Sequence, residues 1–343
     1  MRHPTWQANP VSHVDMQMPQ FGYATLGFRI LNSADRRSVR HFDILPIKAL
    51  RFSDWAISGD HVRFSIRRRW CRPPLCRSSS DAGFGGLLNM QYMQLDLALL
   101  TALVERWRPE THTFHFTSAE ATVALQDVEI ITGLSVDGGP VTGSTDLNWE
   151  QMVLDLLGLE LQNAPWRRGN KVTLQWLWGH FNGQVQETDT QVQIEQKAPG
   201  YIMQLIGSVL VLDELSSRVH LCYIELLRDL KAAGQYSWGS ARLGSLYRGL
   251  CHLSESNIKD ARGLFVLLQV WAWERLPYLA PGRVGDRPPR HGAALTRRWD
   301  EKFHSPDLAT HVVGHYRHSL NMQKPDEGVI CSHIFILKFV SNA

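Results

Sequence analysis

Three common kinds of catalytic site depend on short runs of small residues, and this sequence lacks all three. A phosphate-binding P-loop ends in Gly-Lys-Ser or Gly-Lys-Thr, but no lysine here is preceded by Gly or followed by Ser or Thr. The glycine clusters at 83–86 and 138–139 lack the third glycine of a dinucleotide-binding turn. Ser240 follows Gly239 without the closing glycine of a nucleophile elbow. These patterns argue against P-loop hydrolases, nicotinamide or flavin enzymes and serine hydrolases.

Metal ligands are equally sparse. His112 and His115 are three residues apart on a predicted strand, so their side chains point to opposite faces and are poor joint ligands. Cys71 and Cys76 have a zinc-finger spacing, but no second ligand pair follows at a matching distance. The 59–61 fragment Gly-Asp-His lacks the further motifs of a metallophosphatase. We therefore expect no catalytic residues, no metal and no cofactor.

Tryptophan next to arginine is the composition of single-strand nucleic-acid sites, where bases stack on rings and phosphates pair with cations. Trp107 lies between Arg106 and Arg108. Trp107, Trp271 and Trp273 also lie in apolar runs, where tryptophan is more often part of a core. We interpret these rings as architectural. For the charges at Arg106, Arg108, Glu274 and Arg275, ion pairs that hold helices in place are the alternative to a nucleic-acid contact.

Charge is distributed unevenly along the 343 residues. Residues 1–86 hold 13 Lys and Arg against 6 Asp and Glu, while the remainder holds 23 against 27, so +7 and −4 give the net +3. A basic arm favours polyanions such as nucleic acid, although an arginine-rich coding bias gives the same composition. The candidate phosphate contacts of this arm are Arg63, Arg67, Arg68, Arg69, Arg72 and Arg77.

Targeting signals and disulfide patterns are missing from the sequence. Five widely spaced cysteines do not form a secreted disulfide framework. The N-terminus lacks the apolar stretch of a signal peptide, and no uncharged run approaches the ~20 residues of a membrane span. We expect a soluble chain that is not secreted and does not bind a membrane.

The elements that must position these residues are mostly helices. Apolar residues at helical spacing predict helices over 95–108, 127–133, 148–157, 174–181, 201–212, 219–230, 240–250, 264–273 and 306–320. The first is apolar on nearly every side and belongs inside a domain, whereas 219–230 has a polar side and should lie on the surface. Alternation over 111–116 and a β-prone stretch at 122–125 predict a small hairpin. The fold class is therefore mainly α (α+β), a compact multi-helix domain with a small β-hairpin near residues 111–125.

The ends of the chain differ from this helical body. Residues 1–82 form a basic N-terminal extension without a sustained period, and its Pro-Pro and Ser run reads as a linker. Residues 83–320 form the helical domain, and 321–343 form a C-terminal tail that includes an aggregation-prone apolar run. No fixed repeat of 20–50 residues is present, which argues against a solenoid.

Four stretches follow one another along the chain: 97–115 (LALLTALVERWRPETHTFH), 125–138, 234–241 (GQYSWGSA) and 267–276 (LLQVWAWERL). In this order they resemble signatures of the plant mobile domain family, also labelled aminotransferase-like. The resemblance covers about 85–320. Its structural or interaction candidates are Arg106, Trp107, Arg108, Pro109, His112, His115, Tyr236, Trp238, Gly239, Ser240, Trp271, Trp273, Glu274 and Arg275.

This resemblance implies a plant nuclear protein connected with transposable-element silencing, genome integrity and meristem maintenance. A pyridoxal enzyme needs a Schiff-base lysine with phosphate-holding donors, and no lysine in the central part of the body has that setting. We therefore expect a non-catalytic domain in the nucleus, with protein partners in a chromatin-associated complex. The alternatives are direct DNA or RNA binding through the basic arm, and a cryptic transposon-derived enzyme. The sequence specifies no oligomeric state.

Overall fold

The computed structural model describes residues 73–88, 95–117, 119–144, 146–161, 167–168, 170–182, 185–186, 188–211, 218–254, 265–281, 294–299 and 312–322. All of them belong to one compact unit, Ile47–Ala343. Arg63, Arg67, Arg68, Arg69 and Arg72 lie outside the described residues, as does most of the predicted tail. The predicted boundaries of the extension and the tail therefore stay predictions.

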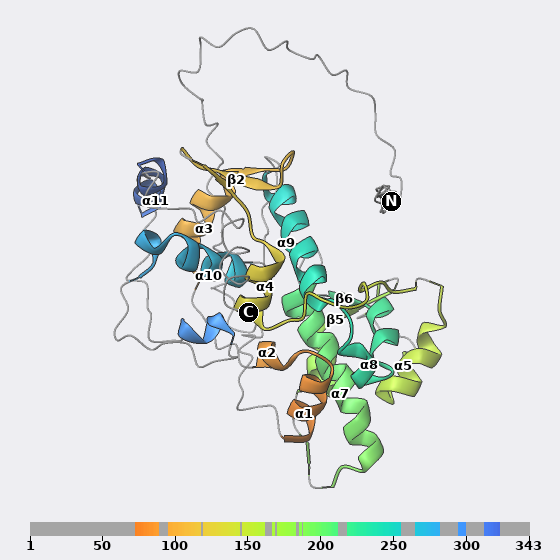
Figure 1. Ribbon diagram of the computed structural model, residues 1–343. Coiled ribbons are helices and arrows are strands. Elements are labelled where there is room, and N and C mark those ends of the chain that lie inside the picture. Colours follow the sequence, from red (N-terminus) through yellow and green to blue (C-terminus); the bar gives the residue numbers. More distant parts are fainter. Residues whose placement is uncertain are drawn as a thin grey trace, which may run out of the picture. The chain divides into compact units, whose positions relative to one another are not determined.

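Helices form most of the described chain, which confirms the mainly α prediction (Figure 1). The α-helices are α1 (Pro73–Asp81), α2 (Gly85–Leu88), α3 (Leu97–Val104), α4 (Leu125–Thr132), α5 (Trp149–Leu157), α6 (Leu174–His180), α7 (Gln191–Leu205), α8 (Leu230–Ala233), α9 (Trp238–Ser254), α10 (Phe265–Arg275) and α11 (Val312–Asn321). A π-helical turn, η2 (Ile206–Leu210), continues α7. Short 3₁₀ turns are η3 (Leu221–Tyr223), η4 (Glu225–Leu227), η5 (Pro277–Leu279) and η6 (Leu295–Arg298).

Two small antiparallel sheets accompany the helices. In the first, β2 (Thr113–His115) lies between β1 (Trp107–Arg108) and β3 (Glu120–Ala121). This sheet contains the predicted hairpin near 111–125, with β1 as a third strand. The second consists of β4 (Arg167–Arg168), β5 (Lys171–Thr173) and β6 (Arg218–His220), in that order. Figure 1 shows the first sheet at one end of α9.

Local capping signals explain where the predicted helices begin and end. The side chain of Asn148 accepts the backbone N–H of Gln151 at the start of α5. Gly158 ends that helix at φ 68°, a left-handed conformation that glycine adopts without steric cost. The Thr190 side chain caps α7 in the same way as Asn148 caps α5, so α7 begins ten residues before the predicted start. Pro199 lies inside α7 and does not break it.

Three sequence interpretations are wrong. The apolar helix ends at Val104, and Trp107 belongs to β1 because it pairs with Phe114 across the sheet. The predicted surface helix over 219–230 is β6 followed by η3 and η4, since Val219 pairs with Val172. The predicted linker around the Pro-Pro and Ser run includes α1, which buries Leu75 in the core.

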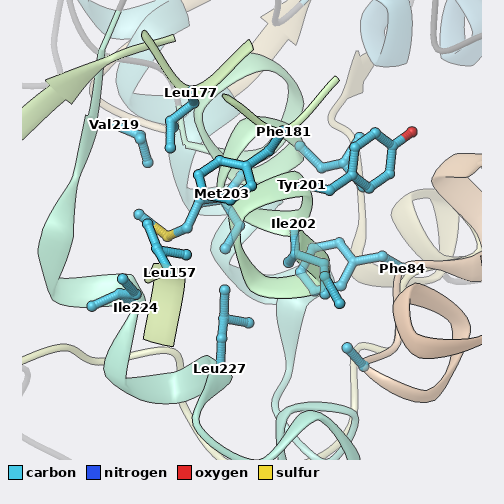
Figure 2. Close-up of a cluster of buried hydrophobic side chains, with 14 of the residues drawn as sticks. Phe84, Leu157, Leu177, Phe181, Tyr201, Ile202, Met203, Val219, Ile224 and Leu227 are labelled. Carbon is cyan, nitrogen blue, oxygen red and sulfur yellow. The ribbon is translucent and has the colours of Figure 1, made fainter. Parts of the chain in front are cut away.

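The core of this unit consists of two clusters of buried apolar side chains. One gathers around α7 and joins α1, α5, α6 and β6. Figure 2 shows Ile202 and Met203 of α7 among side chains from other elements, including Leu157 and Leu227. The other cluster joins α3, α9 and α10 with the first sheet. Burying a large apolar side chain contributes about 1.5–3 kcal/mol, so these contacts dominate the stability of the unit.

Candidate functional site

The first signature ties the end of α3 to α11 through Arg106. Its Nη1 donates to Ala102 O at 2.7 Å, and its Nη2 donates to Asn321 Oδ1 at 2.7 Å and to Arg317 O at 3.1 Å. Burial of this guanidinium lowers the pKa of Arg106. The adjacent Glu105 forms an ion pair with the side chain of Arg317. The guanidinium therefore binds the carbonyl end of a helix that lies far away in the sequence.

Trp107 is the centre of an aromatic group between β1 and α9. Its side chain is 1% exposed, and its ring centroid lies 4.9 Å from that of Phe114 and 5.4 Å from that of Tyr247. Its indole N–H donates to Cys251 Sγ at 3.4 Å. A buried indole with a partner for its N–H is a structural anchor, and no part of this ring is available for stacking with a base.

His112 and His115 do not converge. His112 has φ 53° and an exposed side chain, and among the described residues it alone has positive φ without being glycine. Its ring stacks on Tyr247 with centroids 5.4 Å apart, and its carbonyl accepts the Thr122 hydroxyl at 2.7 Å. His115 instead lies on β2, with Nε2 3.4 Å from Glu120 Oε2. The two rings therefore form no joint metal site.

Arg108 and Pro109 lie where β1 runs into the turn before β2. Arg108 pairs with Thr113 in the register of β1 and β2, and its side chain faces solvent. Pro109 is half-buried in the turn that joins the two strands. Arg77, the member of the predicted basic set that the structure describes, is exposed on α1.

The third signature packs against the end of the second. Gly239 N–H donates to Ser135 O at 2.7 Å, and a Cβ on Gly239 would lie 2.7 Å from Val136 Cγ1. The Ser237 hydroxyl donates to Val136 O at 2.6 Å and lies 2.6 Å from the Ser240 hydroxyl. Ser240 is thus part of a polar contact between segments about one hundred residues apart, and its printed contacts among the described residues are a hydroxyl and a backbone carbonyl.

Tyr236 and Trp238 complete this contact. Tyr236 forms an isolated parallel bridge with Gly139. Trp238 is fully buried, donates its indole N–H to Ala233 O at 2.9 Å, and packs on Phe84 with centroids 4.9 Å apart. Both residues fix the turn that precedes α9.

The fourth signature fastens α10 to its neighbours. Arg275 forms an ion pair with Asp127, whose Oδ2 also accepts the backbone N–H of Ala124 at 2.9 Å at the start of α4. Glu274 accepts the indole N–H of Trp299 at 2.9 Å. Hydrogen bonds from α10 therefore reach α4 and the residue that follows η6.

Two rings of the same helix are buried. Trp271 is 1% exposed and packs on Phe114 at 5.3 Å, while Trp273 is 4% exposed and packs on Trp299 at 4.7 Å. Together with Trp107 and Trp238, they lie in the apolar clusters. The interpretation of Trp107, Trp271 and Trp273 as core residues is therefore confirmed, and Trp238 is a fourth core tryptophan.

Asp96 is a structural residue that the sequence reasoning missed. Its Oδ1 accepts Leu99 N–H at 3.0 Å at the start of α3, and its own N–H donates to Gln269 Oε1 at 2.6 Å. The Tyr316 hydroxyl of α11 donates to Asp96 Oδ2. Burial, followed by the hydrogen bond to Asp96, raises the pKa of Tyr316. An aspartate directly before an apolar run is an N-cap signal, and that signal was present in the sequence.

Arg242 is a second missed residue. It is fully buried on α9, and burial lowers its pKa to about 10. Arg242 lies between Ala241 and Leu243 on a long helix, and these neighbours do not indicate that its guanidinium is buried.

Few of these polar groups are arranged for chemistry. Within the described residues, no group of three or more His, Cys, Asp or Glu side chains is placed to hold a metal ion. None of the helices described combines the length and apolar character needed to cross a membrane. Most of the signature side chains form contacts between helices and strands of the fold. The exposed polar side chains of the first signature lie on the β1–β2–β3 sheet and in the turn between β1 and β2.

Comparison with known proteins places this architecture in context. Residues 83–333 match a family model described as plant mobile domain. The chain is 43% identical over 220 residues to a serine/threonine-protein phosphatase 7 long form homolog of Arabidopsis thaliana, covering 64% of this chain and 16% of that protein. It is 33% identical over 270 residues to protein MAIN-LIKE 2 of the same plant, covering 78% of this chain and 40% of the relative.

A third relative is the Arabidopsis thaliana protein MAINTENANCE OF MERISTEMS, 37% identical over 205 residues, with 59% of this chain and 42% of that protein covered. The chain thus spans less than half the length of each of these three relatives. No solved structure matches the chain significantly.

Proposed function

Because the chain belongs to the plant mobile domain family, we propose that it acts as a non-catalytic interaction domain in a nuclear, chromatin-associated protein complex. The proposed role of that complex is transposable-element silencing, genome integrity and meristem maintenance. One matched relative is named for the maintenance of meristems, which supports the last of these roles.

The observation that carries the proposal is the use of the signature side chains. Arg106 binds the end of α11, Asp127 pairs with Arg275, and Gly239 meets the 135–136 segment. A side chain engaged in a buried bond between two elements contributes to stability, and moving it to serve a substrate would break that bond. These signature residues are therefore accounted for by the fold, which supports a domain that binds over one that catalyses.

The first experiment tests the non-catalytic part. Purified full-length protein is incubated with nucleotide triphosphates, a phosphoester and amino acids with pyridoxal phosphate, and product is measured over time. We expect no turnover above a boiled control. Turnover that disappears after one substitution in a non-structural residue would overturn the proposal.

The second experiment tests the nuclear complex. The full chain is fused to a biotin ligase and expressed in plant cells, with a nuclear-targeted ligase alone as the matched control. We expect chromatin proteins to be enriched over that control. Labelling confined to extranuclear proteins would contradict both the localisation and the proposed partners.

Direct nucleic-acid binding is the second candidate, favoured by the charge of residues 1–86 and by the exposed position of Arg77. Phosphate contacts predict that affinity falls steeply with salt. The deletion that tests it must end at residue 72, because Leu75 and Ala82 are buried in the core. Binding that ignores salt would exclude phosphate contacts, and binding that survives removal of residues 1–72 would exclude those residues as its source.

A further inference from the structure

The second sheet, β4–β5–β6, has one face that the apolar core does not use (Figure 1). Val172 of β5 pairs with Val219 of β6, and both side chains are buried. Because side chains alternate along a strand, their neighbours Lys171, Arg218 and His220 point to the opposite face. All three are half-buried, and Lys171 lies directly across from His220. This outer face therefore brings basic side chains of two strands together.

The charge of this sheet is one-sided. Its three strands contain four Lys and Arg and no Asp or Glu, the four being Arg167, Arg168, Lys171 and Arg218. The elements α6 and η3 directly follow β5 and β6, and η2 packs on β6; none of the three contains an acid. The acid that α5 brings to this sheet is Glu150, next to Trp149, whose ring centroid lies 6.1 Å from that of His220. Four positive residues against one acid leave this part of the described chain positive.

Arg218 is the residue of this face whose polar groups the fold does not satisfy. Its Nε is buried and has no hydrogen-bond partner among the described residues, and its side chain forms no ion pair with them. His220 is fixed on the same face, because its Nδ1 accepts the Cys222 N–H at 3.0 Å. Buried donors in folded proteins nearly always have an acceptor, so the Arg218 guanidinium is expected to receive one from outside the chain.

We propose that this face binds the phosphodiester backbone of a nucleic acid, with one phosphate on the Arg218 guanidinium and the next on the Lys171 ammonium. The two residues are diagonal neighbours across β5 and β6, which separates them by roughly 7–8 Å. At that spacing the two cations engage separate phosphates. This site belongs to the folded body and goes beyond the proposed function, whose nucleic-acid alternative uses the basic arm.

The surroundings of the face favour a nucleic acid over an acidic peptide. Protein–protein interfaces have an apolar core, whereas protein–nucleic acid interfaces are more polar and much more positively charged. Among the described residues, the large apolar side chains that are exposed lie on α4, α5, α7 and η5 and directly after α11, and none lies on this sheet. Because phosphate contacts carry no sequence information, binding here depends on salt and not on the order of the bases.

The test measures the affinity of the full-length protein for fluorescent single strands of DNA and of RNA by anisotropy, over a series of salt concentrations. Arg218→Gln and Lys171→Gln each remove one charge from the face. The second variant leaves the buried guanidinium in place, so it tests the same face if Arg218→Gln does not fold. Arg108→Gln is the matched control, since Arg108 is an exposed strand arginine on the first sheet, which also carries Glu120.

For single strands, the slope of log affinity against log salt is about −0.7 for each phosphate contact. We therefore expect Arg218→Gln and Lys171→Gln each to flatten the slope by about 0.7, which corresponds to a loss of about fivefold at roughly 0.1 M salt. Strands of different base sequence should lose affinity equally. Arg108→Gln should leave the slope unchanged. A purely structural role of Arg218 would lower the melting temperature without changing the slope.

The contribution of the basic arm is separated by a further variant of the full chain. Arg67→Gln, Arg68→Gln and Arg69→Gln are combined, first alone and then with Arg218→Gln. Binding that remains in the arm variant should fall by the same factor when Arg218→Gln is added.

Four results would overturn the inference: no binding by the wild type, unchanged slopes in both face variants, an equal loss in Arg108→Gln, or binding abolished by the arm variant alone. Stronger competition by polyglutamate than by an unlabelled strand of equal charge would also overturn it, because the face would then suit an acidic protein. The proposed function fails separately, when the biotin-ligase fusion of the wild type labels no chromatin protein in nuclei.

Discussion

The ion pair between Asp127 and Arg275 offers the sharpest test of the architectural interpretation. It joins α4 to α10, and the two side chains are 6% and 15% exposed. Removing one partner of a buried pair leaves the other charge without compensation, which typically costs about 3–5 kcal/mol. Asp127→Ala also removes the acceptor of the Ala124 N–H, worth about 1 kcal/mol for a helix cap. Against a typical domain stability of roughly 5–15 kcal/mol, either loss is large.

A double-mutant cycle separates the pair from these additional losses. The variants are Asp127→Ala, Arg275→Ala and the double change, and the free energy of unfolding is measured by urea titration followed by far-ultraviolet circular dichroism. The helix cap is lost both in Asp127→Ala and in the double variant, so its contribution cancels in the cycle. We expect a coupling energy between Asp127 and Arg275 of about 2 kcal/mol. The exposed pair Arg228–Glu225 is the matched control, and its coupling should be close to zero.

The reasoning fails if the coupling between Asp127 and Arg275 is below about 0.5 kcal/mol, the usual level for independent sites. Such a result would mean that the signature charges do not hold α4 and α10 together. An unchanged dependence of unfolding free energy on urea concentration is required in all four proteins, because a change would indicate altered compactness.

Three further predictions use single residues. Gly239→Ala should destabilise the protein by about 1–3 kcal/mol in thermal unfolding, because the new Cβ would meet Val136. Gly244→Ala on the same helix is the control: its Cβ would have no atom within 4 Å, so it should stabilise the protein by up to about 1 kcal/mol. Equal effects of the two substitutions would contradict the close approach at Gly239. His112→Gly should cost less stability than His112→Ala, since glycine tolerates φ 53° and both variants lose the stacked ring; the reverse order would refute backbone strain at this turn. Because the pKa of Tyr316 is raised in the folded state, the folded protein keeps the phenol proton at a pH where the unfolded chain, with a pKa of 10.0, loses it. The stability that this group contributes is therefore fully present below pH 10 and declines above it. Tyr316→Phe should flatten that decline in unfolding titrations between pH 9 and 11, and an identical slope would exclude the titration of Tyr316 as its cause.

Elements with local signals were predictable from the sequence, and elements that depend on distant partners were not. The start of α5 at Asn148 and its end at Gly158 follow from side-chain capping and from glycine conformation, both local properties. Trp107 was assigned to a helix because it follows an apolar run, but pairing with Phe114 places it in a strand. The apolar residues of 219–230 have helical spacing. Val219 nevertheless lies in a β-strand, because it pairs with Val172 on β5.

The candidate site follows the same rule. Trp107, Trp271 and Trp273 were expected in the core from their apolar surroundings, and all three are buried. Trp238 is also buried, although its neighbours in the sequence are small or polar. The bonding partner of Arg106 lies more than two hundred residues away on α11, and sequence spacing carries no information about it. Asp96 had a capping signal, but its links to Gln269 and Tyr316 depend on the packing of three helices.

These long-range bonds give a physical reason for the order and composition of the four signatures. The first is bonded to α11, the second to the third through the 135–139 segment, and the second to the fourth through Asp127. Each signature therefore depends on a partner that another part of the chain supplies, and a change in one member leaves a buried group without its bond. The long-range bonds therefore account for the positions of these signature side chains within the described part of the fold.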